Sequence, residues 1–439
     1  MYKGTVSLNY TWLLFDILSR PDNVRKTEAL ITLLYAAHGL KASKLYLKAA
    51  FHKKFLLSSH SSIKITISEY LGVESAVVIA PAKEVKYAKK WRANSMSKKQ
   101  KELLVSGYGP VGGEPSVKLW EMSDDYKVEN TIWREHIKEP SYLCTWKDMC
   151  FGIREEKESG SVLCYQRIGE TYVLRHELEL QGGDLCHILY EPGESVLYCS
   201  FYGTGHVAAV KVEDYRFTTI LNFFKLPANP ESGIARAHCC EKEPQGSYVL
   251  FAGIAQDKVF VFQTEGGKIL SELPAAEIDL NKDAGPRHLK FHPILNFLYV
   301  ITEYSNEIYV YLFEKKEGEP LFTRIQVIST LPELFRGVSY GSGLAISKDG
   351  RFLYAANRGA DSIAVFDINP DGLLTKKQDI SCKGEHPRHI ALTKDDKCLM
   401  IANQKSNQVV FYAVDEMTGR LKDVIQRMDF NNPSYVEEV

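Results

Sequence analysis

The feature that most constrains the fold of this 439-residue chain is an internal repeat that fills its last three quarters. From about residue 100, a unit recurs that reads as an apolar strand, a turn, a strand containing Tyr, a polar corner and a Val/Ile/Phe strand. A fourth, more polar strand follows each unit, and full units recur about every 45 to 55 residues. Seven units are recognisable, the first partial and the second weaker: residues 103–106, 140–143, 185–210, 236–262, 285–303, 342–366 and 387–412.

Four short strands at this period predict the blades of a propeller, because one small sheet cannot bury both of its faces alone. We therefore predict an all-β fold, a seven-bladed β-propeller, over residues 96–439. Strands that are buried on both faces would explain the continuous apolar runs. The tail Asn432–Val436 resembles the start of the second unit, Glu139–Leu143, so it either closes the ring or only echoes the motif.

Residues 1–95 differ from the repeats and are basic. Residues 1–100 hold 17 Lys and Arg against 6 Asp and Glu, an excess of +11, although the whole chain has a formal net charge of −1. Helical spacing over Thr27–Leu57 predicts two short helices, and Ile63–Ile67 and Val77–Ala80 read as strands. We expect an N-terminal mixed, partly helical extension of unknown function, either a solvated basic segment or one that binds a polyanion or membrane surface.

Composition argues against several other classes of protein. The nine cysteines include no C-x-x-C pair, and no His, Asp or Glu cluster has the spacing of zinc ligands, so we predict reduced thiols and no metal. No apolar run approaches the roughly 18 residues of a membrane span. We expect a cytoplasmic protein with no cofactor, no nucleic-acid partner and no membrane association, and we make no prediction of its oligomeric state.

Three long phrases within the repeats resemble one protein family. They are G-P-R-H-L-x-F-H-P at 285–293, S-x-D-G-R-F-L-Y-A-x-N-R-G-x-D-S-I-A-V-F at 347–366 and A-N-Q-x-S-N-x-V-V at 402–410. Their order and spacing resemble the seven-bladed propeller lactonases, which include the propeller-type 6-phosphogluconolactonases and the fungal carboxymuconate cyclases. The resemblance covers roughly residues 100–430. The chain departs from the pattern at Ser200–Gly203, Ala235–His238 and Tyr340–Gly343.

The resemblance implies a pocket near the propeller axis, whose charged residues match His238, Arg287, Glu303 and Arg358. The residues themselves support this, because a charged Arg or Glu beside a buried strand needs a partner or a ligand. Two arginines and one glutamate leave excess positive charge, which suits the phosphate or carboxylate of a small anionic substrate.

Lactone hydrolysis gives these residues expected roles. His238 would take a proton from the attacking water, with Glu303, held ionised by arginine, as the rival base. One of Arg287 and Arg358 would stabilise the oxyanion, and the other would hold the anionic group. Matching the repeats places Glu303 opposite Asn357 and Asn403. The residues expected to bind substrate are His187, His288, Asn357, Arg388 and His389.

Each residue also has a structural explanation. Arg287 and Glu303 could form an ion pair that stabilises one blade, and His238 could be a hydrogen-bonded core histidine. Arg358 could pair with Asp361 at a turn. Glu155 lies in the second unit, where the family often has a glutamate, although the alignment there is loose.

Three functions remain open from the sequence. The first is hydrolysis of an anionic sugar lactone, with 6-phosphogluconolactone as the expected substrate. The second is lactone-forming cyclisation of a muconate-type acid in the same pocket, and the third is a non-catalytic propeller that binds protein partners. Convergence of the charged side chains on one cavity would favour an enzyme. Pairing within single blades around a filled channel would favour a scaffold.

Overall fold

The computed structural model describes residues 56–57, 62–67, 76–81, 101–109 and 113–439, and the regular elements in these ranges are strands. The chain divides into two compact units, Met1–Lys98 and Lys99–Val439. In the first unit, β1 (Leu56–Leu57), β2 (Ser62–Ile67) and β3 (Ala76–Pro81) form an antiparallel sheet. The two predicted strands are confirmed. The predicted helices lie outside the described residues, except that Leu56 and Leu57 form a strand and no helix end.

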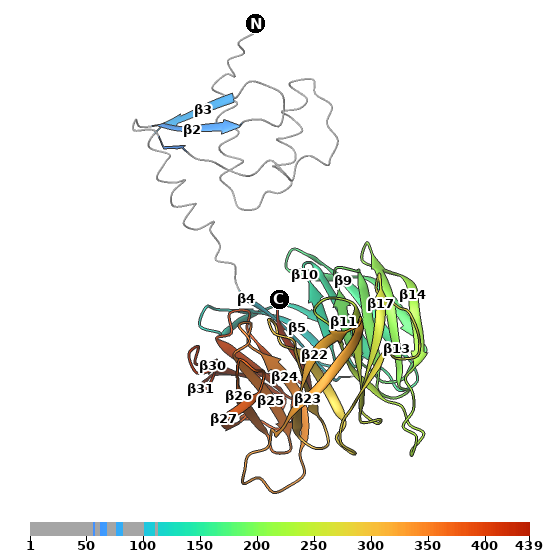
Figure 1. Ribbon diagram of the computed structural model, residues 1–439. Coiled ribbons are helices and arrows are strands. Elements are labelled where there is room, and N and C mark those ends of the chain that lie inside the picture. Colours follow the sequence, from blue (N-terminus) through green and yellow to red (C-terminus); the bar gives the residue numbers. More distant parts are fainter. Residues whose placement is uncertain (1–55, 58–61, 68–75, 82–100, 110–112) are drawn as a thin grey trace. The chain divides into compact units, whose positions relative to one another are not determined.

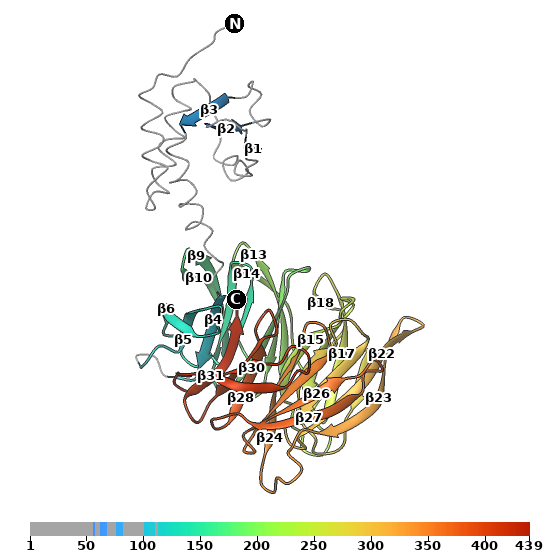
Figure 2. The same cartoon turned by 90° about the vertical axis from the view of Figure 1, so that its left-hand side faces the viewer.

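The second unit is the predicted seven-bladed propeller, with four-stranded antiparallel blades around a common centre (Figures 1 and 2). The first blade joins both ends of the unit, in the order β32-β4-β5-β6. Its strands are β4 (Lys101–Gly107), β5 (Val117–Met122), β6 (Val128–Glu135) and β32 (Pro433–Glu438). The tail therefore closes the ring, because β32 pairs with β4 as the inner strand of that blade.

Blades two to four follow in chain order. The second has β7 (Leu143–Trp146), β8 (Met149–Glu155), β9 (Gly160–Ile168) and β10 (Thr171–Leu180). The third has β11 (Leu185–Glu191), β12 (Val196–Phe201), β13 (His206–Glu213) and β14 (Arg216–Lys225). The fourth has β15 (Ala237–Lys242), β16 (Tyr248–Gly253), β17 (Lys258–Glu265) and β19 (Ala276–Asp279), and the short β18 (Lys268–Ile269) also pairs with β17.

Blades five to seven are regular. The fifth has β20 (Pro286–Phe291), β21 (Phe297–Thr302), β22 (Glu307–Lys316) and β23 (Glu319–Ser329). The sixth has β24 (Tyr340–Ile346), β25 (Phe352–Arg358), β26 (Ser362–Ile368) and β27 (Leu374–Ser381). The seventh has β28 (Pro387–Leu392), β29 (Cys398–Asn403), β30 (Gln408–Val414) and β31 (Leu421–Asp429).

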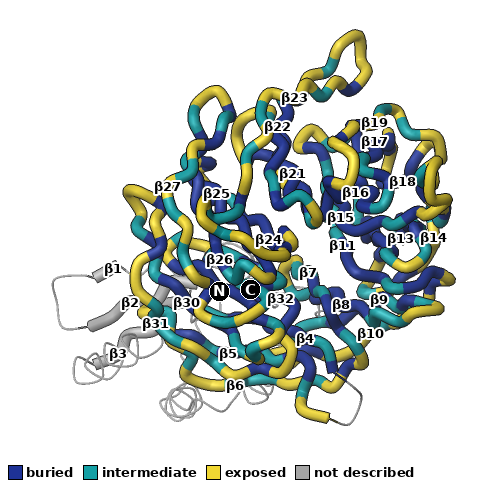
Figure 3. Tube along the Cα trace, turned by 90° about the horizontal axis from the view of Figure 1, so that it is seen from below, coloured by how far each residue is buried: buried dark blue, intermediate teal, exposed yellow. Residues whose placement is uncertain are grey.

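Burial falls from the second strand of a blade to the outer strand, as the repeat predicts. Every residue of β12, β16, β25 and β29 is buried, whereas most residues of β14 and β23 are exposed or half-buried. Figure 3 shows the exposed outer strands at the rim and the buried strands nearer the centre. The described part of the chain contains no helix with the length and hydropathy of a membrane span, and all nine cysteines are free thiols.

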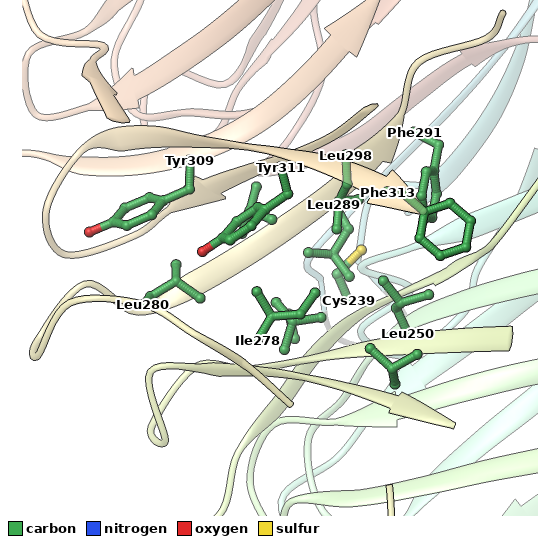
Figure 4. Packing of buried hydrophobic residues seen from close by; sticks show 14 of the residues in the cluster. Cys239, Leu250, Ile278, Leu280, Leu289, Phe291, Leu298, Tyr309, Tyr311 and Phe313 are labelled. Atoms are coloured by element: carbon green, nitrogen blue, oxygen red, sulfur yellow. The ribbon is translucent and has the colours of Figure 1, made fainter. Parts of the chain in front are cut away.

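Hydrophobic clusters between neighbouring blades hold the ring together. Seven clusters are present in the described residues, and each combines residues of two adjacent blades. In the cluster between blades four and five, Leu250 and Ile278 face Leu289, Leu298 and the rings of the fifth blade (Figure 4). Burial of these apolar faces is the main stabilising term, because a single blade would leave them in water.

The tyrosine of the repeated second strand has a structural role in four consecutive blades. Tyr198, Tyr248, Tyr299 and Tyr354 each donate their hydroxyl to the carbonyl of a glycine in an outer hairpin of the next blade, at 2.7 to 3.0 Å. Each ring fills the interface and its hydroxyl stays hydrogen-bonded, which a phenylalanine could not achieve. The recurrent tyrosine is thus explained by blade packing.

Candidate functional site

A β-bulge at the same place in successive inner strands turns one side chain of each strand toward the propeller axis. The pairing register shifts between Leu185 and His187 in β11, and at the equivalent places in β20, β28 and β32. A bulge leaves one residue unpaired and re-aims its side chain. We call these residues the bulge positions: Cys186, Arg287, Arg388 and Ser434, with His238 at the corresponding shift in β15.

Two more sets of equivalent residues surround the bulges. The residue after each second strand, here called the strand-end position, donates its backbone N–H to the carbonyl of the residue that leads into the first strand, here called the leading position. Glu303 donates in this way to Gly285, and Tyr202 donates to Asp184. The strand-end positions are Tyr108, Glu155, Tyr202, Ile254, Glu303 and Gln404, with Arg358 in the same place in β25. The leading positions include Glu139, Asp184, Arg236, Gly285, His386 and Asn432.

This register corrects the predicted match of Glu303 with Asn357 and Asn403. Those asparagines pair with Gly341 and Pro387, as Thr302 pairs with Pro286, so Glu303 corresponds to the next residues, Arg358 and Gln404. A slip of one residue exchanges the two faces of a strand. The prediction therefore assigned Asn357 to the wrong position.

Asn357 is directed into its own blade. Its Nδ2 donates to the carbonyl of Thr330 at 2.9 Å and to Ser362 Oγ at 3.2 Å, and its Oδ1 accepts from Thr330 Oγ1 at 2.6 Å. The side chain is fully buried. Both amide protons are used within the blade, so the structure does not bring Asn357 together with the other predicted site residues.

A small polar cavity of about 10 Å³ lies at the axis. Such a volume holds roughly one water molecule, so the side chains nearly fill the centre. The bulge positions line the cavity with the residues that flank them: Ser141, Tyr142, Cys186, His238, Arg287, His288, Arg388, His389 and Ser434. Five predicted residues thus meet there: His238, Arg287, His288, Arg388 and His389. The lining does not include His187, Glu303 or Arg358.

Glu303 joins two blades through two arginines, and we call these three residues the Glu303 cluster. Its Oε2 accepts from Arg287 Nε at 3.0 Å within the fifth blade and from Arg358 Nη2 at 2.9 Å across from the sixth. Burial alone would raise the pKa of the Glu303 carboxyl, but Arg358 and Arg287 together hold it below its ordinary value. Glu303 is therefore ionised, as predicted, and the cluster carries a net charge of +1, two guanidinium groups against one carboxylate. Arg358 pairs with Glu303, so the alternative pairing with Asp361 is wrong.

Several buried polar atoms around the cavity have no hydrogen-bond partner. They include Arg287 Nη1, Arg358 Nε and His238 Nδ1. A buried donor left without an acceptor costs about 1 to 3 kcal/mol, and more when the group is charged. Native proteins rarely leave such groups unpaired without a functional reason. The unpartnered guanidinium and imidazole atoms therefore mark the axis as a place for a polar, anionic ligand.

The imidazoles of the centre are neutral. Burial, followed by the nearby Arg287 guanidinium, holds the pKa of His238 well below its ordinary value. Burial and the same arginine do this for His288, and burial lowers the pKa of His389 to about 3. His187 is also neutral and buried, and its Nδ1 accepts the backbone N–H of Cys240 at 3.3 Å. A neutral His238 can accept a proton, whereas His187 is engaged by the sheet.

A second polar group at the axis joins Arg388, an expected binding residue, and Glu155 through Tyr108, which no sequence motif indicated, and we call it the Glu155 chain. Arg388 Nη2 donates to Tyr108 Oη at 2.5 Å, and Tyr108 Oη donates to Glu155 Oε2 at 2.7 Å. Burial raises the pKa of Tyr108, so its hydroxyl stays protonated. Tyr108 and Glu155 hold strand-end positions equivalent to Glu303. A repeat alignment with the correct register would have identified both.

Glycines allow the sixth blade to approach its neighbours at one of the departures from the family pattern. A Cβ at Gly341 would lie 2.2 Å from the carbonyl oxygen of Thr302, and one at Gly343 would lie 2.9 Å from the backbone nitrogen of Ile390. Both contacts involve backbone atoms, so neither can relax by side-chain rotation. The glycines of Tyr340–Gly343 are therefore required by packing around the axis.

Comparison with known proteins agrees with this architecture. Residues 102–438 match a family model described as "Lactonase, 7-bladed beta-propeller". A 6-phosphogluconolactonase of Bacillus subtilis is 29% identical over 321 residues, which cover 71% of this chain and 90% of that protein. A 6-phosphogluconolactonase of Buchnera aphidicola is 24% identical over 330 residues, 73% of this chain and 95% of that protein. The periplasmic gluconolactonase of Pseudomonas aeruginosa superposes with a TM-score of 0.71 at 24% identity, covering 77% of this chain and 99% of that one.

Proposed function

Because the chain belongs to the seven-bladed β-propeller lactonases, we propose that it hydrolyses an anionic sugar lactone and that its substrate is 6-phosphogluconolactone. Relatives from two organisms that cover most of the propeller carry the name 6-phosphogluconolactonase. The observation that carries the proposal is the Glu303 cluster beside His238. His238 of blade four and Arg287 of the cluster in blade five line one cavity, and His238 Nδ1 and Arg287 Nη1 have no protein partner there. Glu303 joins Arg287 to Arg358 of blade six.

In the proposed reaction, water attacks the ring carbonyl carbon while the C–O bond to the ring oxygen breaks. The products are a carboxylic acid, which ionises, and the freed hydroxyl group. His238 accepts the proton of the attacking water, since its lowered pKa keeps the imidazole neutral. Arg287 offers its unpartnered Nη1 to the oxyanion that develops on the carbonyl.

Glu303 is assigned a positioning role and no proton transfer. Two charged hydrogen bonds hold its carboxylate, and they favour the ionised form, so it is a weak base. It fixes the guanidinium planes of Arg287 and Arg358, which keeps their remaining N–H groups in place for the substrate. The pKa of His238 is lowered as well, so the choice of base rests on geometry: both arginines hold Glu303 Oε2, whereas His238 Nδ1 has no partner and lies at the cavity.

The test is a hydrolysis assay on the purified full-length protein. Lactone opening releases a proton near neutral pH, so a pH indicator follows it, and the spontaneous rate is subtracted. We expect His238→Gln and Arg287→Lys to lower kcat about 10²-fold or more, the usual effect of removing a general base or an oxyanion donor. Arg324→Gln, on the outer strand β23, is the charge-matched control.

The small volume of the axial cavity is also what a non-catalytic propeller with a filled channel would show. If the wild-type protein does not accelerate hydrolysis above the spontaneous rate, the enzymatic proposal is wrong and the scaffold function is favoured. If hydrolysis occurs but survives both substitutions, the reaction stands and the roles assigned to His238 and Arg287 are wrong.

A further inference from the structure

We propose that Arg236 and Tyr202 form a separate anion subsite, which binds the phosphate group of the lactone while its ring carbonyl lies at His238 and Arg287. This inference rests on the proposed function and deepens it, because it names the part of the site that selects a phosphorylated substrate. Arg236 holds a leading position in blade four, and Tyr202 holds a strand-end position in blade three. Both residues lie in segments that depart from the family pattern, Ser200–Gly203 and Ala235–His238.

Arg236 differs from the other central arginines in its partners. Its Nη1 donates to Tyr202 Oη at 2.7 Å, and its guanidinium lies over the Tyr202 ring, 4.7 Å from the centroid. Among the residues that the structure describes, it forms no ion pair. Asp184 is the carboxylate close enough to respond to it: burial raises the pKa of Asp184, and Lys157 and Arg236 oppose that rise.

The other central arginines are already linked to a carboxylate. Arg287 and Arg358 share the Glu303 carboxylate, and Arg388 is linked to Glu155 through Tyr108. A guanidinium carries five N–H donors, and Arg236 spends one of them on a neutral hydroxyl. Its remaining donors keep the fork geometry that binds phosphate through two parallel hydrogen bonds. Arg236 is therefore the central arginine best suited to an added anion.

The subsite lies next to the reacting groups. The Tyr202 ring stands edge-on to the His238 ring, with centroids 6.0 Å apart, so Tyr202 lies in contact with both Arg236 and His238. Tyr304, which follows Glu303, has its pKa raised by burial and then by Tyr202 and Glu303. These tyrosines give a sugar ring an aromatic surface between the two charged ends of the site.

Size also separates the two ends. The axial cavity of about 10 Å³ has room for roughly one water-sized group, such as the carbonyl oxygen, and neither the lactone ring nor a phosphate group fits inside it. Arg236 and Tyr202 are only half-buried, and Tyr304 is 38% exposed, so a bulky, hydrated anion can reach them from solvent. The carbonyl end then enters the axis and the phosphate stays outside. This replaces the expectation that Arg287 or Arg358 holds the anionic group.

The experiment compares two substrates in wild type, Arg236→Gln, Arg236→Lys and the Arg324→Gln control. 6-Phosphogluconolactone and the unphosphorylated glucono-δ-lactone are followed with the same pH indicator. For Arg236→Gln we expect kcat/KM on the phosphorylated lactone to fall about 10- to 100-fold, mainly through KM, as for loss of charged hydrogen bonds. On glucono-δ-lactone we expect less than a twofold change. Arg236→Lys should recover part of the loss, since it keeps the charge but not the fork.

A binding measurement separates this inference from the proposed reaction. Calorimetric titration with 6-phosphogluconate and with gluconate needs no turnover, and we expect Arg236→Gln to weaken binding of the phosphorylated acid alone. Equal losses on both substrates, or no loss on either, would overturn the subsite while lactone hydrolysis stands. If wild type hydrolyses neither lactone, the proposed function fails. Phosphate-selective binding that depends on Arg236 would then still support the subsite.

Discussion

The Glu303 cluster and the Glu155 chain are built from equivalent positions in distant blades, yet they differ in one connection. Glu303 contacts two guanidinium groups directly, whereas a tyrosine hydroxyl stands between Glu155 and Arg388. The direct contacts hold the pKa of Glu303 below its ordinary value despite burial. The cluster has a net charge of +1, whereas the chain is neutral overall, with one guanidinium, one neutral hydroxyl and one carboxylate.

The difference shows how a repeated scaffold makes an asymmetric site. Every blade offers a strand-end position, and every blade except the second offers a bulge in its inner strand. The side chains placed there determine what each sector of the axis can do. The Glu303 cluster has unpartnered donors and excess positive charge, so it can meet an oxyanion. In the Glu155 chain, each side chain forms a hydrogen bond with the next one. We therefore expect the first group to determine catalysis and the second to support the wall of the cavity.

Replacing the two glutamates should have the largest effect and should separate the groups. Glu303→Gln leaves two buried guanidinium groups without a counter-charge, which typically destabilises by about 3 to 5 kcal/mol. We expect Glu155→Gln to cost about 1 kcal/mol, since the amide oxygen can still accept from Tyr108. Thermal unfolding of both variants measures this, and the lactone assay should show a loss of at least about 10²-fold for Glu303→Gln alone. Equal losses in the two variants would contradict the distinction.

The Glu303 carboxylate and the imidazoles around it should affect stability in different pH ranges. The pKa of Glu303 is lowered in the folded state, so its contribution is complete above about pH 4.5 and is lost as pH falls through the folded value. The pKa values of His187, His238 and His288 are also lowered, so the unfolded chain binds protons below about pH 6.5 that the folded chain does not. Each such imidazole removes up to ~1.4 kcal/mol per pH unit.

We therefore expect the melting temperature to fall steadily from about pH 6.5 to 4.5, before Glu303 titrates. His288→Gln should reduce this slope, whereas Glu303→Gln should lower the melting temperature without changing the slope in that window. Melting curves recorded at half-unit pH steps in constant ionic strength would measure both effects. A slope that is unchanged in His288→Gln would show that groups elsewhere govern acid unfolding.

The sequence was sufficient to predict the propeller because each blade repeats the same local pattern. Apolar second strands, turn residues and the interface tyrosines recur with a period that only a ring of blades explains. The first blade was the hardest to recognise, since its strands come from both ends of the propeller unit, with β32 inside β4. Closure of the ring depends on pairing between strands from the two ends of the propeller sequence, and a local sequence pattern cannot reveal such pairing.

Site residues could be predicted where they belong to long sequence motifs. They were missed or misplaced where their position depends on the exact pairing register of the strands. Arg287 and Arg358 lie within the quoted phrases, and Glu303 directly follows the next strand after the first phrase. Tyr108 stands next to the partial first unit, where no second repeat residue anchors an alignment. Asn357 was misplaced by a slip of one residue between second strands: aligning Phe297–Tyr299 with Phe352–Tyr354 matches Glu303 to Arg358. The residues that the bulges of the inner strands turn toward the axis are harder to recognise. Bulges depend on the partner strand and on space at the axis, so they cannot be recognised from a single sequence.

Tyr108→Phe tests the Glu155 chain itself and should have a small effect compared with Glu303→Gln. The change removes one hydroxyl, so Arg388 and Glu155 each lose a hydrogen bond while the ring still fills its place. We expect a loss of about 1 to 2 kcal/mol in stability and a fall of a few-fold in kcat/KM. A larger fall in kcat would show that Tyr108 takes part in the reaction, so that the two groups share catalysis.

The double variant Tyr108→Phe/Glu155→Gln decides whether the chain acts as a unit. If Tyr108 couples the two charged groups, the stability loss of the double variant should be smaller than the sum of the single losses by about 1 kcal/mol. If the losses simply add, Tyr108 and Glu155 stabilise the blade separately. The Glu155 chain would then consist of two independent hydrogen bonds. It would differ from the Glu303 cluster both in net charge and in having no energetic coupling between its charged groups.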